Sequence, residues 1–307
     1  MMKNERVPQQ FASISALHRA LGLPKPMHPL VSLVNYADIT TPEAELPKAM
    51  LMDFYKISYK FNLQGRIKYG QQHYDFDEGG ISFMAPRQLI SATDEEKDYS
   101  GYTLLIHPDF LRSYALAKTI KNFGFFAYAA NEALYLSAKE KQTISEVFEH
   151  ILGELRGNID DFSQDVIVSH IEVLLNYSNR FYKRQFLTRK AVNVDLLTKL
   201  ESLLEAYFNN DEALTNGLPT VQYLANEMYL SPRYLSDLLR SLTGQNTQQH
   251  IHEKLIEKAK EYLVSRQLTV AEVAYQLGFE HPQSFNKIFK KKTALTPIAF
   301  KNAFHKN

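Results

Sequence analysis

A stretch near the C-terminal end places hydrogen-bonding and cationic side chains on one side of a predicted helix. The other side is apolar, because Phe285, Ile288 and Phe289 recur at helical spacing. The polar side carries Gln283, Ser284, Asn286, Lys287, Lys290 and Lys291. Amide and hydroxyl groups can hydrogen-bond to base edges and ammonium groups can neutralise phosphates, so this side has the chemistry of a DNA contact.

A short helix and a turn precede that helix and would position it. Val273, Ala274 and Leu277 fall at helical spacing and therefore face one way. Gly278 can take the positive φ that a tight turn needs. Pro282 suits the first position of the following helix. Helix, glycine turn and polar-faced helix together form the helix-turn-helix plan.

The same plan occurs about fifty residues upstream. In a register that needs one extra residue in the later turn, Leu235 corresponds to Phe285 and Pro232 to Pro282. The other matching pairs are Leu224-Ala225 with Val273-Ala274, Met228 with Leu277, Leu230 with Phe279, and Arg240 with Lys290. Many helical hairpins share a single copy of this plan, so two copies in tandem are much more specific for DNA binding.

The upstream polar-faced helix carries its own candidates for DNA contact, which are Arg233, Ser236, Asp237 and Arg240. Arginine can grip guanine through two hydrogen bonds, and glutamine can do the same to adenine. Asp237 is unusual because a carboxylate repels phosphate. It could accept from a cytosine amino group, or it could orient Arg233 or Arg240.

A predicted helix over residues 247–265 joins the two units. About 18 residues at about 1.5 Å each give a length of about 27 Å. That length could hold two recognition helices close to one DNA turn apart, about 34 Å, in successive major grooves. This spacing favours DNA binding over a generic helical bundle.

At these residues the chain resembles the AraC/XylS family of bacterial transcription regulators. The resemblance covers roughly residues 195–304. The segments that carry it are Val273-Ala274, Gly278-Phe279, Phe285, Phe289-Lys290 and Leu295-Thr296-Pro297. Ala294 stands where the family has glycine, and Lys301 stands where arginine is usual. The resemblance implies that the base-reading positions are Arg233, Ser236, Asp237, Gln283, Ser284 and Lys287.

Composition is consistent with a two-domain protein of 307 residues, 45% of them hydrophobic. The chain has no cysteine, which excludes disulfides and thiolate metal sites and suits a reducing cytoplasm. No long apolar run predicts a membrane span, and the N-terminus lacks an apolar signal core. Net charge is only +1, but from His281 onward there are six Lys and no Asp or Glu.

The expected fold class is α+β. Residues 1–30 read as an arm with one small helix, and residues 31–106 as short strands separated by turns. The family resemblance implies that residues 31–136 form a cupin-like sensor barrel. Residues 137–190 read as two amphipathic helices, a dimerisation region by resemblance, followed by a linker at 188–193. Residues 195–307 form the DNA-binding half, with its first helix over 196–208.

A small-molecule effector is a separate hypothesis, since barrels of this size can hold one ligand. Its candidate contacts are Tyr55, Lys56, Ser58, Tyr59 and Arg66. We predict no metal, cofactor or catalytic site. His73 stands alone, His250 and His252 point in different directions on a predicted helix, and His107 before Pro108 reads as a helix-entry residue.

The sequence therefore predicts a cytoplasmic, dimeric transcription regulator that is not an enzyme. Its partners would be double-stranded promoter DNA, a second copy of the chain, an effector, and RNA polymerase. Two alternatives stay open. One is a cupin-type enzyme with a fused helical domain, which a barrel metal held by His and Glu would favour. The other is a regulator whose barrel serves only for dimerisation, which a filled barrel would favour.

Overall fold

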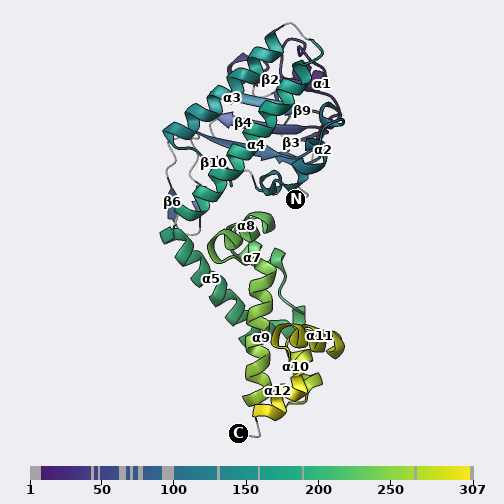
Figure 1. Cartoon of the computed structure of the whole chain (residues 1–307), viewed down its shortest axis with the longest axis vertical. Coiled ribbons are helices and arrows are strands. Elements are labelled where there is room, and N and C mark those ends of the chain that lie inside the picture. The colour runs from purple at the N-terminus through teal and green to yellow at the C-terminus, as the bar shows by residue number, and fades with distance from the viewer. Residues whose placement is uncertain are drawn as a thin grey trace, which may run out of the picture. The chain divides into compact units, whose positions relative to one another are not determined.

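The computed structural model describes residues 8–42, 45–47, 49–61, 67–69, 72–74, 79–91, 100–129, 132–157, 160–188, 190–265 and 268–304. The chain divides into two compact units, Met1–Gln185 and Phe186–Asn307, which we call unit 1 and unit 2. Unit 1 combines sheets with helices, whereas unit 2 is helical (Figure 1). The α+β class predicted from the sequence is confirmed.

Unit 1 contains a five-stranded antiparallel sheet in the order β10-β7-β4-β9-β2. Its strands, from β2 to β10 in chain order, are Val31–Asn35, Tyr55–Lys60, Gly80–Met84, Gly101–Ile106 and Leu134–Tyr135. A three-stranded sheet has the order β1-β3-β8, with strands Gln9–Phe11, Ala49–Met52 and Leu89–Ser91. The remaining pair is the antiparallel β5, Ile67–Tyr69, and β6, Gln72–Tyr74.

Helices cover one face of the five-stranded sheet. They are α3, Ala138–Arg156, and α4, Ser163–Thr188, which lie across the strands in Figure 1. The capping box predicted at the start of α3 is confirmed, because the Ser137 side chain and the Glu140 side chain each accept from the other residue's backbone. The buried stripe of α3 packs on the sheet through Phe148, whose ring lies 5.6 Å from that of Tyr59.

The N-terminal arm covers the other side of unit 1. The expected small helix is α1, Ile14–Ala20, and its side chains join a core with Phe11, Val34 and Leu105. Strand β1 was not predicted, and it pairs in parallel with β3. Three residues give too short a pattern to recognise, and their pairing partner lies about forty residues away. The arm is therefore part of the unit's core.

Several expectations for unit 1 need correction. In the described part of the chain the strands form open sheets, so the closed barrel is not confirmed. The strand expected over 49–61 is broken at Asp53-Phe54, and the one over 80–90 is broken by a turn with Arg87 at φ 65°.

His107 does cap a turn, since its Nδ1 accepts from the Asp109 N–H at 3.2 Å, but that turn is only the 3-10 segment Pro108–Leu111. The other short helix of this region is α2, Leu116–Thr119.

Unit 2 consists of eight helices in the part that the structure describes. They are α5 Lys190–Asn209, α6 Glu212–Asn216, α7 Val221–Glu227, α8 Pro232–Thr243, α9 Thr247–Ser265, α10 Val270–Gln276, α11 Pro282–Thr293 and α12 Pro297–Phe304. The segment predicted as a linker, 188–193, is helical from Lys190, where α5 begins, and the division between the units lies a few residues earlier, at Gln185 and Phe186. No Gly or Pro lies between 190 and 209, so no residue there interrupts the helix.

Phenylalanines dominate the core around α10 and α11. Phe279, Phe285 and Phe289 are buried, and their tilted rings contact one another in turn, with centroids 5.5 and 5.6 Å apart. Burying each such side chain contributes about 1.5–3 kcal/mol. The polar residues between them on α11 are thereby held outward.

Candidate DNA-binding surface

The first helix-turn-helix unit is α7 and α8. Thr220 and Ser231 cap the two helices, each accepting a backbone N–H through its hydroxyl. Pro232 occupies the first turn of α8, as predicted. The turn between the helices uses Tyr229 at φ 57°, a conformation that glycine adopts more readily. The buried stripe of α8 is Tyr234, Leu235, Leu238 and Leu239.

Three charged residues share the exposed face of α8. The Arg233 Nε donates to Asp237 Oδ2 at 3.0 Å, and the Arg240 Nη1 lies 3.5 Å from Asp237 Oδ1. About half of each arginine side chain is exposed, against 18% of the Asp237 side chain. Of the two roles predicted for Asp237, this geometry matches the orientation of Arg233 and Arg240.

Ser236 does not join this face. Its hydroxyl lies 3.0 Å from the hydroxyl of Thr247, which is fully buried at the start of α9. Because this bond occupies the hydroxyl and the residue is half-buried, the geometry does not favour Ser236 as a base contact.

The second helix-turn-helix unit is α10 and α11. Thr269 and Glu272 form a capping box at the start of α10. Gly278 has φ 89°, as the turn requires. A Cβ there would lie 2.6 Å from the carbonyl carbon of Gly217 and 2.8 Å from the Ala213 oxygen. Only glycine fits that approach, so Gly278 sets both the turn and its packing against the segment after α6.

All six polar candidates on α11 are exposed, and they are Gln283, Ser284, Asn286, Lys287, Lys290 and Lys291. Beside them is a groove of about 330 Å³ between α11 and the start of α12. Its lining residues are Asn286, Lys287, Lys290, Thr296, Pro297 and Ile298. The sequence did not indicate this groove, because it depends on how α12 turns back after Ala294.

Helix α9 joins the two helix-turn-helix units and is anchored on α5 by an ionic cluster. Lys258 is only 5% exposed, and its Nζ donates to Glu205 at 2.5 Å and to Asn209 at 2.9 Å. Lys254 also contacts Glu205, at 2.5 Å. These hydrogen bonds lower the pKa of Glu205 to about 2. Burial opposes the charge on Lys258, but its carboxylate partners outweigh that effect and raise its pKa.

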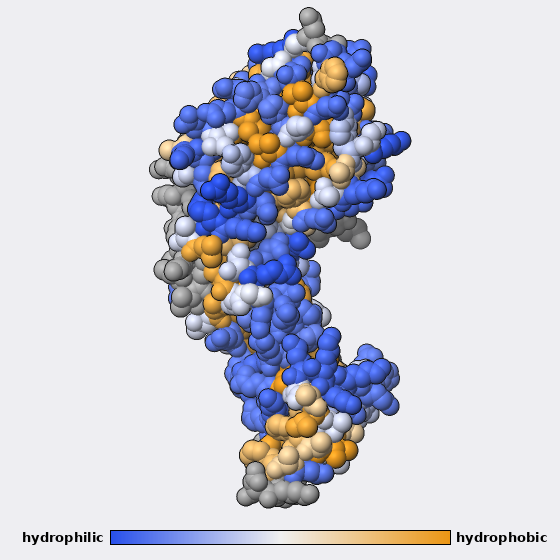
Figure 2. Space-filling view, viewed as in Figure 1, coloured by the Kyte–Doolittle hydropathy of each residue, from blue (hydrophilic) through white to orange (hydrophobic). Residues whose placement is uncertain are grey.

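Hydrophobic side chains gather at the end of unit 2 where α10 and α12 lie (Figure 2). Leu295, Ile298 and Phe304 are 44%, 61% and 59% exposed. They adjoin a strongly cationic helix, since α11 carries four Lys and no carboxylate. This end of unit 2 is therefore both apolar and basic.

The five effector candidates of unit 1 do not form one group. Tyr55 and Tyr59 face the helices, where their rings contact Phe126 and Phe148. Lys56 and Ser58 alternate with them and so point to the opposite face of β4. Arg66 lies outside the described residues.

Tyr36, which the sequence did not single out, lies beside Lys56 and Ser58. Its hydroxyl donates to Ser58 Oγ at 2.9 Å, and the Lys60 Nζ lies 3.9 Å from the centre of its ring. Burial raises the pKa of the Tyr36 phenol, but the charges of Lys56 and Lys60 and the hydrogen bond to Ser58 outweigh burial and lower it. The face of β4 that carries Lys56 and Ser58 therefore includes buried polar groups, the hydroxyls of Tyr36 and Ser58.

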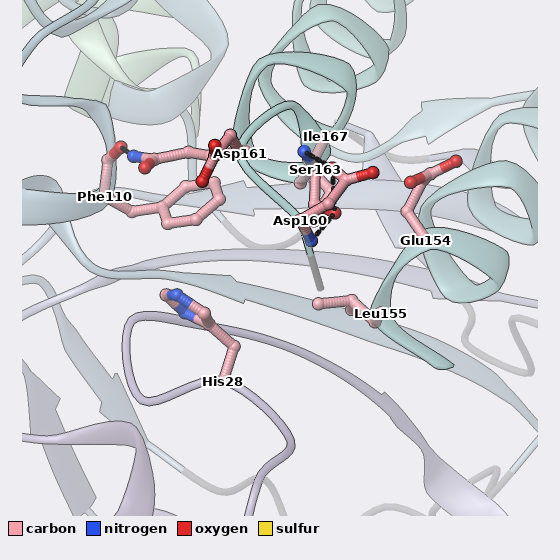
Figure 3. A pocket seen from close by; sticks show the side chains of 9 residues that line it. His28, Phe110, Glu154, Leu155, Asp160, Asp161, Ser163 and Ile167 are labelled. Carbon is pink, nitrogen blue, oxygen red and sulfur yellow. Dashed lines mark hydrogen bonds between the residues drawn. The ribbon is translucent and has the colours of Figure 1, made fainter. Parts of the chain in front are cut away.

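A cavity of about 300 Å³ lies between the ends of α3 and α4 and the loop that carries His28 (Figure 3). Its carboxylates are Glu154, Asp160 and Asp161. Asp160 accepts the backbone N–H groups of Phe162 and Ser163 at 2.9 Å, so it serves the start of α4. These bonds lower its pKa. The cavity is therefore lined in part by groups that already have a structural role.

Within the described ranges, no three His, Asp or Glu side chains lie together as a metal site would require. His250 and His252 bond to Thr243 and Gln248 respectively, so they point apart as predicted. His73 lies in β6, where nothing is described of its side chain. No helix in the described part of the chain combines the length and the apolar character that crossing a membrane requires.

Comparison with known proteins finds the family match in unit 2. A family model described as a helix-turn-helix domain matches residues 224–303. The uncharacterized transcriptional regulatory protein YesN of Bacillus subtilis is 32% identical over 93 residues, 29% of this chain and 25% of YesN. The chain thus spans a quarter of that relative.

Two further relatives extend the comparison. The uncharacterized HTH-type transcriptional regulator YfiF of Bacillus subtilis is 21% identical over 254 residues, which are 82% of this chain and 77% of YfiF. The solved C-terminal domain of the two-component response regulator yesN from Fusobacterium nucleatum is 31% identical with a TM-score of 0.29. It covers 33% of this chain and 96% of that domain.

Proposed function

Because the C-terminal part of the chain is a helix-turn-helix domain of the AraC type, we propose that the protein is a sequence-specific, DNA-binding transcription regulator. The observation that carries the proposal is the pair of exposed polar faces on α8 and α11, joined by α9 within one unit. Two recognition helices held at a fixed spacing suit successive major grooves of one duplex.

The residues on these faces have complementary tasks in the proposal. Arg233, Gln283 and Lys287 stand near the N-terminal and middle turns of their helices, where recognition helices contact base edges. Arg240, Lys290 and Lys291 stand further along and would contact phosphates. Ser284 and Asn286 are also exposed on α11, where their side chains would hydrogen-bond to base edges or to phosphates.

Unit 1 has a regulatory role in the proposal. It would form a cupin-like sensor or dimerisation module in a cytoplasmic homodimer, acting at promoters together with RNA polymerase. The polar interior around Tyr36, Lys56 and Ser58 supports a sensing role. Effector binding would shift a pre-existing equilibrium between arrangements of the two DNA-binding halves of the homodimer.

Selection of bound DNA from a random pool tests the proposed function. The full chain is incubated with random duplexes at stated salt, with and without cell metabolites, and bound DNA is sequenced. We expect enrichment of a sequence with two contacted segments about one helical turn apart. Enrichment that changes with metabolites would support sensing by unit 1. Absence of any enriched sequence would contradict the proposed function.

A further inference from the structure

The ion cluster on α8 leaves the two terminal nitrogens of the Arg233 guanidinium exposed to a partner outside the helix. Asp237 engages Arg233 through Nε, at 3.0 Å. No other contact of the guanidinium is recorded among the described residues, and nearly half of the side chain is exposed. The two terminal nitrogens of Arg233 can therefore donate together to a single partner beyond the helix. Guanine presents two acceptors, O6 and N7, at the matching separation in the major groove.

We propose that Asp237 is a positioning residue which fixes Arg233 for recognition of a guanine, so that α8 contributes sequence discrimination more than affinity. The proposal rests on the proposed function, and it names G·C as the base pair that the first helix-turn-helix unit reads. An arginine side chain has many rotamers, and holding its Nε removes much of that freedom before DNA arrives. Pre-ordering of this kind lowers the entropic cost of forming both hydrogen bonds to guanine, a pair of acceptors that the other bases do not present in the major groove.

The charge of Asp237 supports discrimination over affinity. A carboxylate on a DNA-facing helix repels phosphates and so weakens binding to every sequence. In the second helix-turn-helix unit the position that corresponds to Asp237 is Lys287, and α11 carries no acidic residue at all. The two recognition helices therefore differ: α8 has a net charge of +1 over Arg233, Asp237 and Arg240, whereas α11 is purely cationic.

Direct reading of cytosine by Asp237 is the competing arrangement. Its two oxygens already face Arg233 and Arg240, at 3.0 and 3.5 Å. Its side chain is 18% exposed, less than half the exposure of either arginine. A cytosine amino group would have to reach past the two guanidinium groups, so the geometry favours the positioning role.

The test uses the full chain and the duplex that the wild type selects from a random pool. Each base pair of that duplex is replaced in turn, and an unrelated duplex of the same length serves as the nonspecific probe. Dissociation constants are measured at one fixed salt concentration for the wild type, Arg233→Ala, Asp237→Ala, Asp237→Asn and the double alanine variant. Melting temperatures show that each variant folds.

We expect Arg233→Ala and Asp237→Ala to lose discrimination at the same G·C pair, each by about 10-fold. The double variant should discriminate no worse than Arg233→Ala alone, because both changes remove one interaction. Asp237→Ala should bind the nonspecific duplex as tightly as the wild type or tighter. Asp237→Asn keeps an oxygen acceptor for Nε and should retain part of the discrimination.

A matched control separates these effects from loss of any one negative charge. Glu201 is exposed on α5 in the same unit, and Glu201→Ala should leave every base preference unchanged. The positioning role is overturned if Asp237→Ala keeps full discrimination, or if it and Arg233→Ala affect different base pairs additively. Failure of the wild type to select any sequence would instead overturn the proposed function itself.

Discussion

At the residue scale, Lys287 is the clearest test of the second recognition helix. It is exposed in the middle of α11 beside Asn286 and Lys290 and is not recorded in any ion pair among the described residues. We expect Lys287→Ala to weaken DNA binding by about 1–3 kcal/mol and to relax preference at one position if the ammonium reads a base. If it contacts only phosphate, the loss should be uniform across sequences and the salt slope should fall by about 1.

A titration over several salt concentrations distinguishes these outcomes. Lys139→Ala is the control, because it removes the same charge from an exposed site on α3 of unit 1. Unchanged affinity and unchanged selectivity for Lys287→Ala would remove this residue from the DNA-binding surface.

Asp237 and Ser236 on α8 show which contacts helical spacing can predict and which it cannot. Helical spacing placed Asp237 four residues after Arg233 and three before Arg240, so the sequence already contained both ion pairs. The same spacing placed Ser236 near that face, but its hydroxyl bonds to Thr247 on the next helix. A helical pattern predicts which way a side chain points but not which neighbouring helix reaches it.

At the scale of elements, the C-terminal ends of the two recognition helices, α8 and α11, can be compared directly. Gly244 ends α8 at φ 79° and Ala294 ends α11 at φ 62°, both in the left-handed region. Ala294 stands where the family that the sequence resembles has glycine, yet the helix keeps the left-handed end. Alanine there is strained, because its Cβ crowds the backbone in that conformation.

We expect Ala294→Gly to stabilise unit 2 by about 0.5–1 kcal/mol, less than the full strain because glycine also gains freedom in the unfolded chain. The melting temperature should rise by about 3 °C. The reverse change is the control: Gly244→Ala should destabilise by about 1 kcal/mol, since a Cβ there meets nothing within 4 Å and only the backbone conformation is affected. A fall in melting temperature for Ala294→Gly would show that the alanine methyl group has a packing role.

The junction of α5 and α9 should make unit 2 sensitive to acid. Hydrogen bonds from Lys254 and Lys258 lower the pKa of Glu205 from 4.5 to about 2. A carboxyl group with a lower pKa in the folded state stabilises the fold above its unfolded pKa and loses that contribution as pH falls. We therefore expect part of the free energy of unfolding to disappear between about pH 4.5 and about pH 2.

Denaturant unfolding at several pH values, followed for unit 2, measures this contribution. Glu205→Gln should lower stability at pH 7, because Lys258 is buried and would lose its closest carboxylate, and it should flatten the acid dependence. Glu257→Gln is the control, since Glu257 is 67% exposed and contacts only the rim of the cluster through Lys254. An equal effect of both changes would mean that Glu205 has no special role.

At the scale of the whole molecule, the two units were predictable to different degrees. In unit 2, the helix predicted over residues 247–265 coincides with α9, and α8 and α11 begin at Pro232 and Pro282 as predicted, because these helices signal their ends locally. In unit 1, strand pairing joins distant segments, such as β1 with β3 and β10 with β7. Short strands of two or three residues carry no readable period, so the sequence predicted strands but not their arrangement in open sheets.

The spacing of the two recognition helices gives the last prediction. Helix α9 has 19 residues, which at about 1.5 Å each span about 28 Å, and its anchorage on α5 through Lys254 and Lys258 restrains it. Five base pairs inserted between the two contacted segments of the selected duplex would displace one of them by about half a helical turn, onto the opposite side of the DNA. Since α9 cannot extend to follow, binding should fall to about that of a duplex with one segment destroyed. Five base pairs inserted outside the segments should have no effect. Undiminished affinity for the internally lengthened duplex would mean that only one of the two helices enters a groove at a time, and the second would then act through phosphates alone.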